Sequence, residues 1–160
     1  MASLRGAGCG RSAASAVQVA QSFKRDRGEA NYADCLYHKE TAQLVNLAHK
    51  FSLFSEQWQP KVVAEMNDYQ FKVVRIAGDF IWHSHPETDE TLMVVEGVLR
   101  VDFRDGHVLV KAGEMIVVPR GVEHKTSAET EAKLMLIEPR GVLNTGHEGG
   151  ERTAVNDVWI

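Results

Sequence analysis

Three histidines and one glutamate have the residue types and the spacing of a metal site. His83 and His85 are separated by one residue, Glu90 lies downstream of them, and His124 follows the turn at Pro119–Gly121. In a strand, side chains two positions apart project to the same face, so His83 and His85 form a pair of ligands. Three imidazoles and a carboxylate suit one divalent first-row transition metal, without distinguishing Fe, Mn, Ni, Cu and Zn. These four residues are the predicted metal ligands.

Each member of this set also has a simpler interpretation. A His-x-His pair is a common surface feature of strands, and an isolated glutamate is usually solvated. Asp89, which precedes Glu90, is an alternative carboxylate ligand. No Ser-His-Asp order, phosphate-binding loop or separate general base accompanies the four residues, so the catalytic residues stay unassigned. The pattern favours chemistry carried by the metal itself, or binding without catalysis.

The elements that would position these side chains are short strands. Turn signals separate segments of hydrophobic period two, which predict strands over 70–76, 80–85, 90–95, 98–103, 108–111, 115–118, 123–127 and 133–138. Leu47 to Phe54 predicts a short helical lead-in. This spacing favours an all-β antiparallel sandwich or small barrel as a single domain over 46–160, preceded by an extension over 1–45.

Composition excludes several classes of function. The chain has 160 residues, of which 44% are hydrophobic and 25% charged, as in a globular protein with one core. No apolar run reaches the length of a membrane span. Residues 1–25 contain four basic residues and no acid, so the rest of the chain has a net charge of −8, which gives −4 for the whole. Such an acidic body lacks the basic surface that binds nucleic acid. Only Cys9 and Cys35 are present, which argues against a disulfide framework.

The N-terminal segment has the composition of an import sequence. Residues 1–25 are basic and rich in Ala and Ser, and a helix would gather Arg11, Ser15, Gln18 and Ser22 on one polar face. The expectation is a mitochondrial or other organellar location if this segment directs import, and a cytoplasmic one otherwise. A tail without a role is the alternative.

Two motifs in this order resemble the cupin superfamily. The first is His83-x-His85-x4-Glu90-x6-Gly97, and the second is Gly113-x5-Pro119-x-Gly121-x2-His124. The polar tail that begins at Asn144 is similar to that of small standalone cupins often described as mannose-6-phosphate isomerase-like. The resemblance implies a double-stranded β-helix, or jelly-roll barrel, with a central metal held by His83, His85, Glu90 and His124.

The candidates for substrate contact are weaker. Alternation from His124 places Thr126 on the interior face, Arg120 could attract an anion at the mouth, and Tyr69 could act as an acid–base group. The expected lining is mostly apolar (Ile81, Leu92, Val94, Leu99 and Val101), which favours a small organic acid or an aromatic molecule over a sugar.

Three functions follow from this pattern. The first is a metal-dependent enzyme, with a dioxygenase-like reaction preferred. The second is a sugar or sugar-phosphate isomerase, and the third is a non-catalytic module that binds metal or a small ligand. Trp82 and Trp159 are interpreted as packing residues or as contacts of a homodimer.

Overall fold

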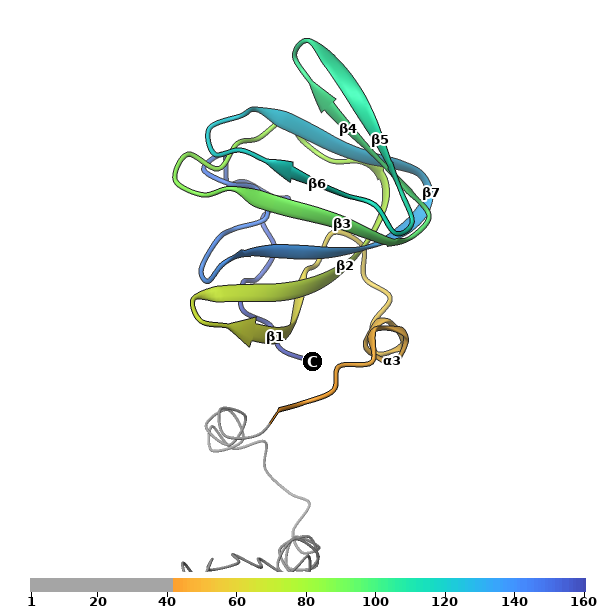
Figure 1. Ribbon diagram of the computed structural model, residues 1–160. Helices are drawn as coiled ribbons and strands as arrows, with labels where there is room; N and C mark the ends of the chain where they lie inside the picture. Colours follow the sequence, from red (N-terminus) through yellow and green to blue (C-terminus); the bar gives the residue numbers. More distant parts are fainter. Residues whose placement is uncertain (1–41) are drawn as a thin grey trace, which may run out of the picture. The chain divides into compact units, whose positions relative to one another are not determined.

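The computed structural model describes residues 42–160, in which Leu44–Ile160 forms one compact unit (Figure 1). The import sequence predicted within residues 1–25 lies outside the described residues and stays a prediction. The elements are α3 (Leu47–Ser52), β1 (Lys61–Met66), β2 (Tyr69–Asp79), β3 (Glu90–Glu96), β4 (Val98–Phe103), β5 (Gly106–Lys111), β6 (Met115–Val118) and β7 (His124–Pro139). Within these residues no helix is long and apolar enough to span a membrane.

Strand β7 organises the sheet. One edge of β7 pairs with β2 along most of its length. The other edge pairs with β4 near the start of β7 and with β3 near the end of β7. The remaining pairs are β1 with β2, β3 with β6, and β4 with β5, all antiparallel. The exposed residues Glu129–Glu131 separate the two halves of β7, where the register with β2 also shifts. One long strand with different partners at its two ends folds the sheet onto itself, as expected of the predicted jelly-roll barrel.

The barrel core follows from alternation along the strands. Leu99 and Val101 of β4, Leu92 and Val94 of β3, and Leu134 of β7 are buried in one apolar cluster. Their neighbours in sequence point outward and are more exposed, as in β3 and in the second half of β7. The same alternation carries His124 and Thr126 to the interior, as the sequence predicted.

A second cluster covers part of the outer face. Phe51 of α3 and the following Phe54 pack against Val63 of β1 and Val73 of β2. The side chain of Asn46 caps the helix by accepting a hydrogen bond from the His49 backbone N–H at 3.0 Å. The predicted helical lead-in is therefore present, although it ends at Ser52 rather than Phe54.

The strand predictions were wrong at three places. Strand β1 was not predicted, because Val62 and Val63 are adjacent apolar residues and break the period of two. The segment 80–85 is not a strand; its backbone contacts β7 through the bridge between His83 and His124 and through the Phe80 N–H, which donates to the Thr126 carbonyl at 2.9 Å. The two predicted strands 123–127 and 133–138 are parts of one strand, β7, which begins at His124 and whose polar middle resembles a turn in the sequence.

The C-terminal segment packs against the stretch that carries the first two histidines. A Cβ atom added to Gly146 would lie 2.0 Å from the carbonyl oxygen of Ser84, and Gly146 has a φ of +56°. The Nδ1 atom of His147 donates to the same Ser84 carbonyl at 3.1 Å. Farther along, the Val62 backbone N–H of β1 donates to the Val158 carbonyl at 2.7 Å. The C-terminal segment is thus an integral part of the domain.

We predict that Gly146→Ala destabilises the domain by about 2–4 kcal/mol, because it adds a backbone overlap to a left-handed conformation. Gly149→Ala is the matched control, since Gly149 has a φ of +63° and nothing within 4 Å of an added Cβ. That control should cost only about 1 kcal/mol. Denaturant unfolding of both variants checks the difference, and equal losses would contradict the close packing at Ser84.

Candidate metal centre

A reciprocal pair of backbone hydrogen bonds joins the two histidine segments. The N–H of His83 donates to the carbonyl of His124 at 3.0 Å, and the N–H of His124 donates to the carbonyl of His83 at 2.9 Å. Residues that are directly opposite in this way place their side chains on the same face. The two imidazole centroids accordingly lie 4.3 Å apart.

Turns on either side bring His85 and Glu90 to the same place. The Gly121 N–H donates to the His85 carbonyl at 2.9 Å, which fixes the chain after His85 against the turn before His124. Glu90 is the first residue of β3, and its carboxylate points inward. The exposed Asp89 instead accepts a hydrogen bond from the Arg120 backbone N–H at 2.9 Å. Of the two carboxylates considered, Glu90 is therefore the one in the cluster.

The four predicted ligands converge inside the barrel. His83, His85, Glu90 and His124 are buried, and each offers one ligand atom within 4.8 Å of the others. Glu90 Oε2 lies 3.2 Å from His124 Nε2 and 3.5 Å from His85 Nε2. Within the described part of the chain, no other group of three or more His, Cys, Asp or Glu side chains has this arrangement.

Backbone carbonyls orient two of the imidazoles. His83 Nδ1 donates to the Ile81 carbonyl and His124 Nδ1 donates to the Val122 carbonyl, each at 3.0 Å. A proton on Nδ1 leaves the Nε2 lone pair of a neutral imidazole free to bind a metal. This arrangement of a ligand ring held by a backbone carbonyl is the usual support of metal-binding histidines.

Buried atoms without partners show that the residues fit a metal ion. His85 Nε2, His124 Nε2 and Glu90 Oε2 are all buried and lack a hydrogen bond of acceptable geometry. Leaving such groups unsatisfied costs about 1–3 kcal/mol each, and more for a charged group. A cation among these atoms satisfies all of them together. The cluster could therefore hold a metal ion.

Burial and proximity shift the protonation of the cluster. Burial and the neighbouring His124 lower the pKa of His83 to about 4, which keeps its ring neutral at ordinary pH. Burial opposes the charged form of His85, but the Glu90 carboxylate outweighs it and raises the His85 pKa. Burial likewise acts to raise the pKa of Glu90, whereas the His124 and His85 rings hold that pKa well below its usual range. Glu90 is therefore an anion facing the three imidazoles.

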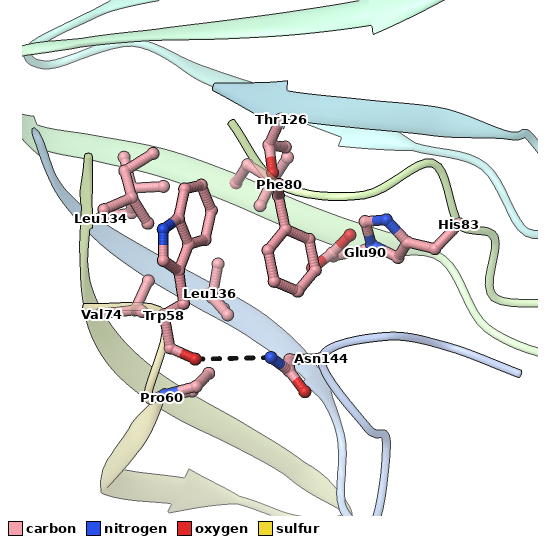
Figure 2. Close-up of a pocket in the computed structure, with 12 residues that line it drawn as sticks. Trp58, Pro60, Val74, Phe80, His83, Glu90, Thr126, Leu134, Leu136 and Asn144 are labelled. Carbon is pink, nitrogen blue, oxygen red and sulfur yellow. Dashed lines mark hydrogen bonds between the residues drawn. The ribbon is translucent and has the colours of Figure 1, made fainter. Parts of the chain in front are cut away.

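A half-open cavity of about 40 Å³ adjoins two of the ligands, His83 and Glu90 (Figure 2). Trp58 and Phe80 form an aromatic wall, with ring centroids 4.8 Å apart and planes within 19°. The Phe80 ring also meets the His83 ring edge to face at 5.4 Å. Trp58 has a φ of +62°, and its indole N–H donates to the Ala77 carbonyl at 3.1 Å. The backbone conformation of Trp58 is thus strained and held in place.

The predicted pocket residues have different positions. Thr126 lines the cavity, as does Leu92 from the expected apolar lining. Arg120 is exposed in the turn before His124, and Tyr69 is half exposed at the start of β2, so neither lines the cavity. Their roles in substrate binding stay predictions.

Trp82 and the tail tryptophan have surface positions. The Arg104 guanidinium lies 3.9 Å from the centroid of the Trp82 ring, so this tryptophan packs within the domain. Trp159 is partly exposed beside β1, with which it forms a backbone bridge at Val62. The homodimer stays a prediction.

A buried ion pair near the cluster was missed in the sequence. Lys72 Nζ lies 3.0 Å from Glu138 Oε1, and both side chains are 2% exposed. Lys72 also donates to the Val142 carbonyl and to Asn156 Oδ1, each at 3.2 Å. Burial and the nearby Glu90 carboxylate raise the pKa of Glu138 against the effect of Lys72. The only sequence signal was the inward parity that Lys72 shares with Val74 and Ile76.

Known proteins match this chain over the barrel. The cupin domain matches residues 72–138, which include all four clustered side chains. The uncharacterized protein YdbB of Bacillus subtilis is 32% identical over 77 residues, covering 48% of this chain and 68% of that protein.

Two crystal structures are also similar. A cupin-2 domain containing protein of Shewanella frigidimarina is 55% identical, with a TM-score of 0.60, over 61% of this chain and 95% of that one. A Neisseria meningitidis protein is 38% identical, with a TM-score of 0.57, over 61% of this chain and 99% of that one. These relatives are bacterial and give the predicted organelle import no support.

The chain has the barrel topology and both motifs in order, and its sequence matches the solved relatives across almost their whole length. The chain therefore belongs to the cupin family.

Proposed function

We propose that this protein is a metal-dependent enzyme that acts on a small organic molecule, with His83, His85, Glu90 and His124 as the ligands of one divalent transition metal. The observation that carries the proposal is the convergence of four buried ligand atoms, three of them without hydrogen bonds, beside a half-open cavity. Four protein ligands leave positions on a six-coordinate ion for substrate or dioxygen.

A dioxygenase-like reaction is the version that the cavity favours. A bound redox-active ion would activate dioxygen, and both oxygen atoms would enter the organic substrate without an external reductant. The chain contributes an apolar wall of Trp58, Phe80 and Leu136 that limits water near the ligands. The Thr126 hydroxyl lies in the lining, where it can orient a substrate oxygen. A sugar isomerase would need more polar groups on this wall.

The first prediction concerns metal content. Purified wild type should bind about one metal ion per chain, and His124→Ala should lose most of it because one of four ligands is removed. His107→Ala is the matched control, since His107 is an exposed histidine of β5 outside the cluster. Elemental analysis of the three proteins checks this. Equal metal in wild type and His124→Ala would remove His124 from the site.

The second prediction concerns stability. A metal present at about a hundred times its dissociation constant stabilises the folded state by about 2.7 kcal/mol, provided that the unfolded chain does not bind it. For a domain of this size the melting temperature of the metal-free protein should then rise by roughly 5–10 °C. Thermal unfolding with and without added Zn²⁺ measures the shift. The shift should be retained in His107→Ala and abolished in Glu90→Ala, and a shift that survives Glu90→Ala would place the metal elsewhere.

The third prediction separates the reactions. Wild type loaded anaerobically with Fe²⁺ should consume one dioxygen per substrate molecule when aerated with its substrate. An oxygen electrode and product analysis across a panel of catechols and 2-oxo acids test this, with Fe²⁺-treated His124→Ala as the inactive control. Conversion of substrate without oxygen uptake would contradict the dioxygenase-like version and favour an isomerase.

A further inference from the structure

The charges around the cavity constrain what can bind there. Among the described residues, no lysine or arginine lines the cavity, and Glu90 is its only acidic residue. Lys72, the one fully buried lysine or arginine among the described residues, has Glu138, the Val142 carbonyl and Asn156 as partners for its three protons. Arg152 lies 5.8 Å from the centroid of the Phe80 ring, but it is exposed, does not line the cavity and donates to the Asp79 carbonyl at 3.1 Å. A second anionic group on a ligand would therefore meet no counter-charge inside.

The charge of the centre itself sets the charge of the ligand. A divalent cation with one carboxylate and neutral imidazoles carries a single net positive charge, which one anionic head group neutralises. An additional ionised group on the body of the ligand would be desolvated against the apolar wall, which is unfavourable without a counter-charge.

Hydrogen-bonding capacity is equally restricted. The side-chain amide of Asn144 is already hydrogen-bonded within the protein. Its Nδ2 donates to the carbonyls of Trp58 and Arg152, and its Oδ1 accepts from the Ala154 N–H. The dashed line in Figure 2 marks its contact with Trp58. The Thr126 hydroxyl has no side-chain hydrogen bond within the described part of the chain and is the polar group still available. A ligand with several hydroxyls would leave most of them unpaired.

The small size of the cavity limits how much of a ligand can lie next to the four clustered side chains. A volume of about 40 Å³ is well below the roughly 150 Å³ that encloses a benzene ring, so only a few atoms fit beside the ligands. Figure 2 shows the Phe80 ring between Trp58 and His83, so the two aromatic rings form a wall that begins at this ligand. The rest of a ligand must therefore lie along aromatic and aliphatic surface.

We infer that the cavity selects molecules with one small metal-binding head, at most singly charged, and an uncharged apolar body, and that it rejects molecules with a second ionised group. The inference rests on the proposed function, because the metal supplies the attraction for the head. The expected substrates are short apolar monoacids and related chelating monoanions. Sugar phosphates and dicarboxylates are not expected to bind in the cavity.

A matched pair of probes tests the selection. 2-Oxopentanoate and 2-oxoglutarate have the same chelating head and chain length, but the second ends in a carboxylate. Wild type is loaded with Zn²⁺, which prevents oxidation, its metal content is measured, and each probe is titrated by calorimetry. We expect 2-oxopentanoate to bind at least about tenfold more tightly. Equal or tighter binding of 2-oxoglutarate, or binding of neither probe to fully metal-loaded protein, would overturn the inference.

A charge placed in the wall should reverse the preference. Thr126→Lys puts an amine inside the cavity, so 2-oxoglutarate should bind more tightly. The ratio of the affinity for 2-oxopentanoate to that for 2-oxoglutarate should then fall to about one or below. Val108→Lys adds the same charge at a partly exposed position of β5 outside the cavity and should leave the ratio unchanged. A Thr126→Lys protein that folds, binds Zn²⁺ and keeps the wild-type ratio would contradict the inference.

The measurement of metal content separates the two proposals. A wild type that takes up no Zn²⁺ would overturn the proposed function, and the inference would fall with it. A fully loaded wild type without a preference between the probes would overturn the inference alone. The comparison is made on the wild type, so it does not depend on whether Thr126→Lys folds.

Discussion

The reciprocal hydrogen bonds between His83 and His124 are the constraint on which the site depends. Two residues far apart in sequence are held directly opposite each other by backbone atoms at 2.9 and 3.0 Å. Backbone hydrogen bonds on both sides support this bridge, because the Phe80 N–H donates to the Thr126 carbonyl and the Gly121 N–H donates to the His85 carbonyl, each at 2.9 Å. Gly146, Gly121 and β7 each contact one of these segments, which makes the geometry of the centre a property of the whole barrel.

Without a cation, the interior of this domain is electrostatically costly. Glu90 is buried and anionic, and the histidines around it lack enough donors in the right geometry to satisfy it. Replacing the whole cluster by well-packed hydrophobic residues would relieve this cost, whereas removing a single histidine would leave the Glu90 carboxylate less compensated. The protein instead keeps four polar groups pointing at one another. Such an arrangement is expected where function, rather than stability, determines the residues.

The sequence predicted the cluster more reliably than the strands around it. The spacing of His83, His85 and Glu90 reflects what one turn between two extended segments can bring together, so it was informative even though 80–85 is not a strand. Ser84, between the two histidines in sequence, is also buried and packs against Gly146, so the burial of this segment does not alternate as in a strand. The wall of Trp58 and Phe80 could not be predicted, because it depends on a left-handed tryptophan and on contacts between distant segments.

The two buried carboxylates, Glu138 and Glu90, have different partners for their charges. Glu138 has Lys72 as its counter-charge, and Lys72 in turn holds the C-terminal segment through Val142 and Asn156. Glu90 has only imidazoles and is thus the carboxylate that a cation must balance. Because Lys72 is fully paired, it neither balances the charge of Glu90 nor offers a charge to a ligand. The same pair that fixes the tail therefore adds no positive charge to the cavity wall, and an ion bound at Glu90 would be the positive centre there.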